Sequence, residues 1–369
     1  MNPVQPKIKS LLITGMFRSG TSLLASCVHA HPQVAVSWQP YWMFFKACRN
    51  KFYREVRHVP FDEAYPLGIL QFSTSEERQL FADIFETVSF SPEEVTHLVS
   101  DIQGYLSRPD EHMNKGLKPA DLAGYLDGMP GGKAGDILAE LFDRLHRFFQ
   151  DQGIEKETIG VKETFCEEFM EPLLAHWGPD GGILHIIRDP RSIIASRNYG
   201  KYADSTGSCY PIYFIIHSWL RSVQFYEWNK HQPNYAMIRY EDLVTQPRKA
   251  LTAGCRALRI PFSEAMTQSN DFTDGQGKPW ASNSSFERVE TETGIFSSSV
   301  EKWKNILTAD EMAITEFYCK EGLTRLGYPL TLETVPPDTV RNFREDTKRH
   351  PAWLRKYEFH TMENFKNAY

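Results

Sequence analysis

The sequence has few cysteines and no long apolar run. Its six cysteines, among 369 residues, lie far apart and form neither a C-x-x-C pair nor a Cys/His metal pattern. Such spacing is typical of a reduced chain, so we expect a cytoplasmic protein without a bound metal. The apolar stretch around 212–220 contains His217 and Ser218 and is much shorter than a membrane span. The first ten residues also lack the charged-then-apolar order of a signal peptide, so we expect no membrane association.

An excess of basic charge is missing as well. The 41 lysines and arginines are outnumbered by 47 aspartates and glutamates, which gives a net charge of −6. This balance argues against general binding to nucleic acid, although it allows a local basic pocket for one anion. With 41% hydrophobic and 24% charged residues, the composition excludes a disordered or collagen-like chain and indicates a globular protein with a sizeable core.

Short apolar runs alternate with amphipathic segments along much of the chain. We expect strands at 9–14, 34–37, 158–161, 183–187 and 235–239, with helices between them, among them 21–30 and 211–230. This order predicts an α/β fold, with a P-loop-like central parallel sheet and helices on both faces. Helical patterns broken by Pro and Gly predict a mostly helical insertion at about 50–150. We expect one domain over 1–330 and a C-terminal extension over 331–369.

A glycine-rich loop, GMFRSGTS at 15–22, stands between the first expected strand and helix. Its glycine spacing is that of a P-loop, in which backbone N–H groups and a helix N-terminus bind an anion. Thr21 takes the place of the lysine that reaches the β and γ phosphates of a nucleoside triphosphate, and the cation Arg18 lies inside the loop. The pattern therefore favours another anion. The alternative is an ordinary glycine turn capped by Thr21 or Ser22.

Several segments resemble one enzyme family in the correct order. FRSGTSLL followed by AHPQV resembles the 5′-phosphosulfate loop of sulfotransferases that use 3′-phosphoadenosine-5′-phosphosulfate (PAPS), in the Arg-type form of bacterial and tyrosylprotein members. IIRDPRSIIASR at 186–197 is similar to the family's 3′-phosphate motif. YEDL at 240–243 and SVEKWK at 299–304 are similar to later family segments. The resemblance covers about 8–326 and implies that 1–330 is a sulfotransferase domain.

The resemblance implies PAPS as the cofactor, with the bisphosphate PAP as its product and no metal. PAPS carries anions at both ends, and two basic loops at strand ends suit such a molecule. Without a second basic loop, Arg188 and Asp189 would be read as an ion pair that closes a strand. The residues that the resemblance assigns to the cofactor are Arg18, Ser19, Gly20, Thr21 and Ser22 for the phosphosulfate, Arg188 and Ser196 for the 3′-phosphate, Tyr240 for the adenine, and Ser298 and Ser299 in the segment that closes over it.

Sulfuryl transfer needs positioned cations and a group that receives a proton. The resemblance implies that Arg18 and Lys162 stabilise the sulfuryl oxygens and the departing phosphate, although Lys162 also reads as a solvated lysine at a strand end. The family's general base aligns with Gln39, which cannot accept a proton. Glu163 is our first substitute and His31 the second. Otherwise the acceptor is a nitrogen or an acidic hydroxyl that needs little help.

Five aromatic residues in the segment 38–45 follow the second expected strand. They predict either a wall of an acceptor pocket for an aromatic or cationic molecule, or ordinary core packing. These residues are Trp38, Tyr41, Trp42, Phe44 and Phe45.

The sequence thus predicts a sulfotransferase of secondary metabolism, which moves a sulfuryl group from PAPS to a hydroxyl or nitrogen of a natural-product or alkaloid-like small molecule. The alternatives are a small-molecule P-loop kinase, which the missing lysine after Gly20 disfavours, and a non-catalytic nucleotide-binding module, which Lys162 disfavours. The sequence leaves open whether the chain forms a homodimer.

Overall fold

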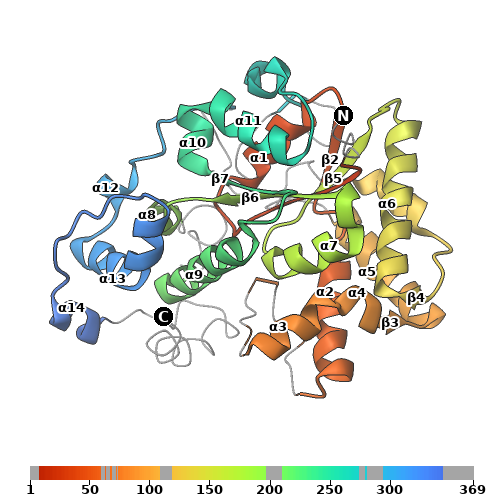
Figure 1. Cartoon of the computed structure of the whole chain (residues 1–369), viewed down its shortest axis with the longest axis horizontal. Coiled ribbons are helices and arrows are strands. Elements are labelled where there is room, and N and C mark those ends of the chain that lie inside the picture. Colours follow the sequence, from red (N-terminus) through yellow and green to blue (C-terminus); the bar gives the residue numbers. More distant parts are fainter. Residues whose placement is uncertain are drawn as a thin grey trace, which may run out of the picture.

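The computed structural model describes residues 8–59, 63, 67–68, 72, 74–108, 119–196, 210–273, 279–280 and 294–343. At its centre is a five-stranded sheet in the order β2-β5-β1-β6-β7, in which all neighbours pair in parallel (Figure 1). This confirms the predicted fold class. The strands are β1 (Ser10–Thr14), β2 (Val34–Trp38), β5 (Thr158–Lys162), β6 (Gly181–Ile187) and β7 (Tyr235–Arg239).

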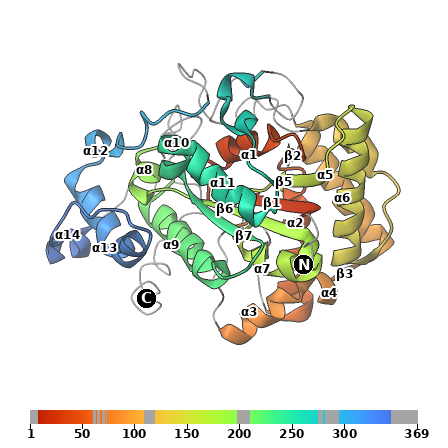
Figure 2. The ribbon, with the colours of Figure 1, turned by 45° about the horizontal axis from the view of Figure 1, so that its top comes forward.

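Helices cover both faces of the sheet, as crossover connections require. On one face lie α1 (Thr21–His29), α10 (Tyr240–Thr245) and α11 (Pro247–Ala257), and on the other lie α7 (Met170–Trp177) and α9 (Ile212–Asn229) (Figures 1 and 2). Successive residues of β1 point to opposite faces, so Leu11 and Ile13 enter the core beside α1, whereas Leu12 enters the core on the other side. The sheet is therefore buried on both faces.

The described residues between 42 and 151, which include the stretch predicted as an insertion at about 50–150, are mostly helical, with one short antiparallel pair that the sequence pattern did not indicate. The helix α5 (Pro92–Ser107) begins with Pro92 and a capping box, in which Ser91 and Glu94 each accept the other's backbone N–H. The elements are α2 (Trp42–Lys51), the π-helix η1 (Phe52–Val56), α3 (Ser75–Ala82), α4 (Ile84–Thr87), β3 (Ser89–Phe90), α5 (Pro92–Ser107), the 3₁₀ helix η2 (Ala120–Leu126), β4 (Gly132–Lys133) and α6 (Ala134–Asp151).

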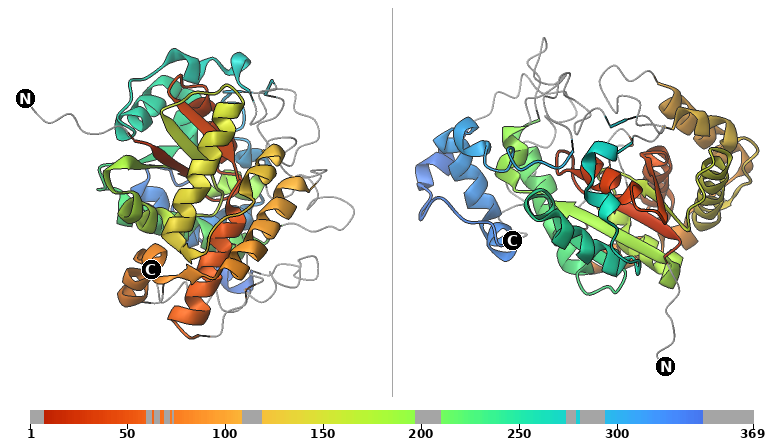
Figure 3. Two further views of the ribbon diagram at one scale, coloured as in Figure 1. Left: turned by 90° about the vertical axis from the view of Figure 1, so that its right-hand side faces the viewer. Right: turned by 90° about the horizontal axis from the view of Figure 1, so that it is seen from above.

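The remaining elements connect the strands or follow the last one. The helices α12 to α14 lie at one end of the sheet, and the insertion lies at the other (Figure 3). Within the described part of the chain, no helix is both long and apolar enough to cross a membrane. The elements are η3 (Glu167–Phe169), η4 (Gly178–Asp180), α8 (Pro190–Ala195), η6 (Glu264–Thr267), η7 (Ser269–Asp271), α12 (Trp303–Ile306), α13 (Ala309–Arg325) and α14 (Pro337–Asn342).

Candidate active site

All five strands end at one edge of the sheet, and each leads into a predicted site residue. In spatial order across the sheet these are Gln39 after β2, Lys162 at the end of β5, Arg18 in the loop after β1, Arg188 after β6 and Tyr240 after β7. Ligands of parallel sheets bind at the carboxyl ends of the strands, beside the point where the connections change direction. Here that point is β1, so the glycine-rich loop lies in the middle of the edge.

The loop after β1 needs glycine at two positions. Gly20 has a φ of 97°, and a Cβ added there would lie 2.5 Å from Cδ2 of Tyr240. A Cβ on Gly15 would lie 2.4 Å from the carbonyl oxygen of Ile186. The N-cap of α1 is Gly20, which has no side chain, so neither Thr21 nor Ser22 caps this turn. The first turn of this helix, with its positive dipole end, is thus available for an anion.

The two basic loops lie in direct contact. Nη1 of Arg188 donates a hydrogen bond to the carbonyl oxygen of Arg18 at 3.1 Å, and Nε of Arg18 lies 3.4 Å from Oγ of Ser196. Ser196 is the C-cap residue of the short helix α8 (Pro190–Ala195). Nε of Arg188 is buried and has no hydrogen-bond partner. A guanidinium donor of this kind suits a phosphate oxygen.

Tyr240 connects Arg188 to the C-terminal part of the chain. The guanidinium carbon of Arg188 lies 4.2 Å from the centroid of the Tyr240 ring, a cation–π contact. The Tyr240 hydroxyl lies 2.9 Å from Oγ of Ser299, in the segment that also contains Ser298. Asp189 pairs with Arg191 at 2.7 Å, so the alternative of an Arg188–Asp189 ion pair is wrong. Arg188 is therefore held by stacking and by a backbone carbonyl.

Lys162 is not a solvated lysine, because its side chain is 2% exposed. Its Nζ donates a hydrogen bond to the side-chain Oε1 of Gln39 at 3.1 Å. The backbone N–H of Gln39 donates to the backbone carbonyl of Lys162 at 2.7 Å. Gln39 has a φ of 49°, a strained value for a residue other than glycine. Burial lowers the pKa of Lys162 to about 8, although the nearby Glu163 carboxylate opposes this shift. The glutamine that replaces a base thus orients a cation.

Only one of the two carboxylate oxygens of Glu163 accepts a hydrogen bond from the described residues. Its side chain is fully buried, Oε1 accepts the Tyr41 backbone N–H at 2.7 Å, and Oε2 has no hydrogen-bond partner. Burial raises the pKa of Glu163 to about 8, although the Tyr41 N–H and Lys162 favour the charged form. His31, the second candidate base, uses Nε2 to contact the Pro261 carbonyl and Nδ1 to accept the Gln33 N–H. His31 is therefore structural.

The aromatic segment after β2 belongs to the core rather than to an acceptor pocket. Trp38, Tyr41, Phe44 and Phe45 are fully buried in two hydrophobic clusters, and the half-buried Trp42 stacks on Tyr105 of α5. Hydrophobic side chains that follow a buried strand pack most readily into the neighbouring core.

A second aromatic group, which the sequence analysis missed, adjoins Arg18. The Phe17 ring centroid lies 5.3 Å from that of Phe165 and 4.4 Å from that of Tyr210, which contacts Phe214 in α9. Phe165 is half-buried and has a φ of 67°, and its N–H donates to the Gly15 carbonyl at 3.1 Å. The only sequence signals were the positions of Phe17 beside Arg18 and of Phe165 three residues after Lys162.

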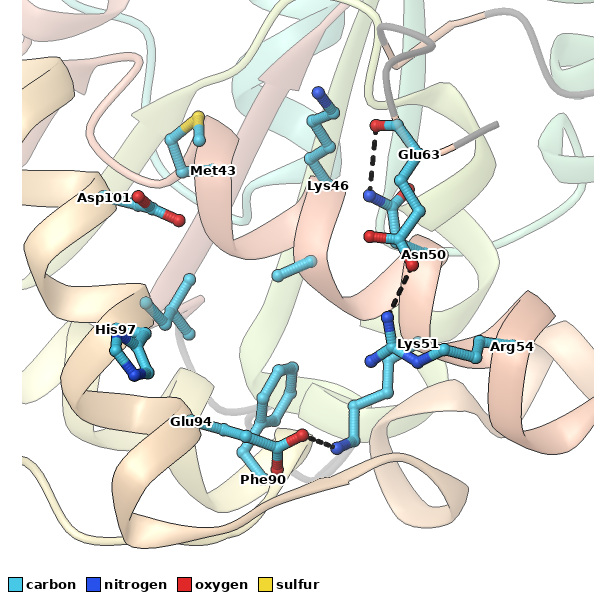
Figure 4. A pocket seen from close by; sticks show the side chains of 12 residues that line it. Met43, Lys46, Asn50, Lys51, Arg54, Glu63, Phe90, Glu94, His97 and Asp101 are labelled. Carbon is cyan, nitrogen blue, oxygen red and sulfur yellow. Dashed lines mark hydrogen bonds and ion pairs between the residues drawn. The ribbon is translucent and has the colours of Figure 1, made fainter. Parts of the chain in front are cut away.

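A cavity of about 450 Å³ lies between α2 and α5 (Figure 4). Four of its charged groups form two ion pairs, Lys51 with Glu94 and Arg54 with Glu63 at 2.5 Å. None of the predicted site residues lines it, so it is a poorer candidate than the sheet edge. The described residues also contain no cluster of His, Cys, Asp and Glu that could hold a metal.

A family model described as "Sulfotransferase family" matches residues 10–264. The chain belongs to this family. Among solved structures, this sulfotransferase is similar to the sulfotransferase domain from the curacin biosynthetic pathway, with 16% identity, a TM-score of 0.49 and coverage of 88% of this chain and 100% of that one. The sulfotransferase domain from the Synechococcus PCC 7002 olefin synthase has 15% identity and a TM-score of 0.43, and the match covers 86% of this chain and 98% of that one. Retinol dehydratase in complex with androsterone and PAP has 14% identity and a TM-score of 0.40, and covers 90% and 84%. No curated protein sequence matches.

Proposed function

We propose that this sulfotransferase uses PAPS to transfer a sulfuryl group to a hydroxyl or nitrogen of a small-molecule acceptor. The observation that supports this most is the contact between two basic loops, in which Arg188 after β6 donates to the carbonyl of Arg18 after β1. PAPS carries a phosphosulfate at one end and a 3′-phosphate at the other. Two adjacent anion sites on neighbouring strands suit that pair of charges.

The described residues fit this cofactor. Residues 19–22 with Arg18 would hold the phosphosulfate, through the helix N-terminus and one guanidinium. Nε of Arg188, buried without a partner, would donate to the 3′-phosphate, and the Ser196 hydroxyl lies 3.4 Å from Nε of Arg18. A buried donor without an acceptor is costly, and a phosphate oxygen relieves that cost. Tyr240, Ser298 and Ser299 would enclose the nucleoside.

Bound PAPS supplies the sulfuryl group, whose bond to the phosphate oxygen breaks as a bond to the acceptor oxygen or nitrogen forms. Arg18 and Lys162 provide positive charge where the departing phosphate and the sulfuryl oxygens gain negative charge. Gln39 holds the Lys162 ammonium in place through the 3.1 Å hydrogen bond. Loss of either cation should reduce the rate by about 10²- to 10³-fold, as loss of an oxyanion donor does.

The acceptor's proton needs a destination, and Glu163 provides one. Its Oε2 is buried without a partner and lies one residue beyond Lys162. In its ionised form this oxygen would take the proton from the acceptor hydroxyl or ammonium, while Oε1 stays bound to the Tyr41 N–H. The raised pKa makes Glu163 a stronger base than an exposed glutamate.

We propose that the acceptor carries an aromatic or similarly flat apolar group, as natural-product and alkaloid-like molecules do, and that the enzyme acts in the cytoplasm. The rings of Phe165 and Tyr210, both half-buried, pack against Phe17, the residue that precedes Arg18 in the chain. A phenylalanine with positive φ costs about 1–3 kcal/mol, and such strain is concentrated at functional sites. The negative net charge of the chain disfavours polyanionic acceptors.

Calorimetric titration tests the cofactor assignment. PAP should bind the wild-type protein, ATP should bind much more weakly, and Arg188→Ala should lose most of the affinity for PAP. Arg248→Ala is the matched control and should bind PAP normally, because it removes an exposed arginine of α11 that pairs with Glu264. Binding of ATP but not PAP would reverse the assignment in favour of a kinase. Incubation with labelled PAPS and a metabolite extract would then identify the acceptor by mass.

A further inference from the structure

Arg191, three residues after Arg188, is the centre of a buried ionic network. Its side chain is fully buried in α8. Nε and Nη2 bind the two carboxylate oxygens of Asp189 at 3.0 and 2.7 Å, and Nη1 donates to Oε1 of Glu316 in α13 at 2.6 Å. A buried guanidinium is stable only when its charge and its N–H groups are matched, and here two carboxylates provide that match.

The same guanidinium holds the C-terminal part of the chain at two further points. Its carbon lies 4.1 Å from the centroid of the Trp303 ring, and Nη1 donates to the Pro329 carbonyl at 2.9 Å. The neighbouring Ser192 donates from Oγ to the Val300 carbonyl at 3.2 Å. We call residues 297–303 the strap. Arg191 and Ser192 together fasten it to α8.

The strap in turn contacts the expected 3′-phosphate site. Ser299 directly precedes Val300, whose carbonyl Ser192 of α8 holds, and its hydroxyl is 2.9 Å from that of Tyr240. The Tyr240 ring supports the Arg188 guanidinium at 4.2 Å. An unbroken series of contacts therefore leads from Glu316 through Arg191 and the strap to Arg188.

Glu316 is itself held firmly. Its carboxylate accepts the backbone N–H groups of Thr331 and Leu332 and the Thr331 hydroxyl, at 2.6 to 3.1 Å. Burial disfavours its charged form, but these hydrogen bonds and Arg191 outweigh burial and lower the pKa of Glu316. The carboxylate is thus ionised at neutral pH and fixes the direction of the Arg191 guanidinium.

We propose that Glu316 and Arg191 form a positioning pair that holds the strap against the 3′-phosphate site, so that preference for nucleotides with a 3′-phosphate depends on a carboxylate of α13. This helix lies outside residues 10–264, the part that the family model matches. The inference rests on the proposed use of PAPS. Neither residue of the pair needs to touch the nucleotide, since the effect passes through Trp303, Val300 and Ser299.

The test compares the affinities of PAP and adenosine 5′-monophosphate, which differ in the 3′-phosphate alone. Glu316→Gln keeps the shape and the acceptor oxygen but removes the charge. It should weaken PAP binding about tenfold, as loss of a charge-assisted contact does, and leave the affinity for the monophosphate within twofold. Glu321→Gln removes an exposed ion pair from the same helix and should change neither affinity.

Two further measurements separate positioning from general stability. Amide hydrogen exchange in the strap should be faster in Glu316→Gln than in the wild type without nucleotide, with no change in β1 or β6. If that variant does not fold, Ser192→Ala removes one fastening and should weaken PAP binding about threefold. An unchanged ratio of PAP to monophosphate affinity in either folded variant would overturn the inference. A wild-type protein that binds PAP no better than the monophosphate would overturn the proposed use of PAPS, and this inference with it.

Discussion

The Lys162 ammonium nitrogen lies 3.1 Å from the amide oxygen of Gln39, and both side chains are buried. The pair joins the ends of two adjacent strands, since Trp38 of β2 is in register with Lys162 of β5. A neutral amide next to a buried ammonium supplies a hydrogen bond without neutralising the charge. The lysine therefore keeps its positive charge available for an anionic ligand.

Gln39→Ala should lower kcat by about tenfold, because Lys162 loses a hydrogen bond to a charged group worth about 1.5 kcal/mol. The KM for PAPS should change less, because Arg18 and Arg188 remain. Gln39→Glu should act differently: a carboxylate beside the ammonium raises the pKa of Lys162 and extends activity to higher pH. Steady-state kinetics across pH distinguish the two variants. A Gln39→Ala enzyme with wild-type kcat would remove Gln39 from any orienting role.

The pH dependence of kcat/KM should be bell-shaped with a maximum near pH 8. Burial raises the pKa of Glu163 to about 8, so the base loses its proton, and activity rises, as pH increases toward that value. Burial lowers the pKa of Lys162 to about 8, so the cation is lost, and activity falls, above it. Lys162 and Glu163 are neighbours and titrate together, so the two pKa values of the pH profile describe the pair rather than either residue alone. A profile that is flat from pH 6 to 9 contradicts this assignment.

Glu163→Gln should remove the acidic limb and reduce kcat by about 10²-fold or more, as loss of a general base does. The thermal stability of the folded state should not fall with kcat. Because the folded-state pKa is raised, ionisation of Glu163 destabilises the folded state as pH rises above the unfolded value near 4.5. A glutamine avoids that cost, so thermal denaturation at pH 8 should show an unchanged or higher Tm. A large fall in Tm would instead indicate a structural glutamate.

Gly20→Ala should destabilise the protein by about 1–3 kcal/mol and reduce PAP affinity. The new Cβ would overlap the Tyr240 ring, and the φ of 97° is unfavourable for alanine. Gly104→Ala, in the last turn of α5 with open space around it, is the matched control and should stabilise the protein by about 0.5–1 kcal/mol. Urea denaturation and PAP titration of both variants provide the measurement.

Phe165→Leu should raise the KM for aromatic acceptors by about tenfold, because it removes a proposed acceptor-contacting ring worth about 1.4 kcal/mol, and should leave PAP binding intact. Phe45→Leu changes the same residue type in the core and should cost roughly 1–2 kcal/mol of stability without affecting that KM. Acceptor kinetics and thermal denaturation of the two variants separate the roles. Equal effects on KM would remove the ring of Phe165 from the acceptor site.

Much of the fold was predictable because strands buried on both faces give short continuous apolar runs. The expected strands at 34–37, 158–161 and 183–187 agree with β2, β5 and β6 to within two residues. The pair β3 and β4 has only two residues per strand, which is too short to produce a pattern. The proposed domain boundary near residue 330 stays a prediction, and Arg197 and Cys209 lie outside the described residues.

The positions of the candidate site residues were predictable where a local motif determines the backbone. Their hydrogen-bond partners were not predictable where those partners lie far away along the chain. The loop with Arg18 and the strand end with Arg188 follow from local sequence. The partners of Lys162 and Arg191 do not, since Gln39 and Glu316 are each more than 120 residues distant along the chain. The aromatic segment after β2 suited an acceptor wall in the sequence, but its side chains fill the core because α2 turns them inward.

The position of β1 at the middle of the sheet divides the active edge into two halves. In the proposed assignment the nucleotide contacts β6, β7 and the strap, whereas Gln39, Lys162 and Glu163 stand at the ends of β2 and β5 on the other side. The proposed acceptor rings of Phe17 and Phe165 stand in the loops after β1 and β5, whereas Tyr210 lies just before α9. A library at these three positions leaves Arg188, Tyr240 and the strap unchanged, so it is the starting point for engineering new sulfate esters or sulfamates from this scaffold.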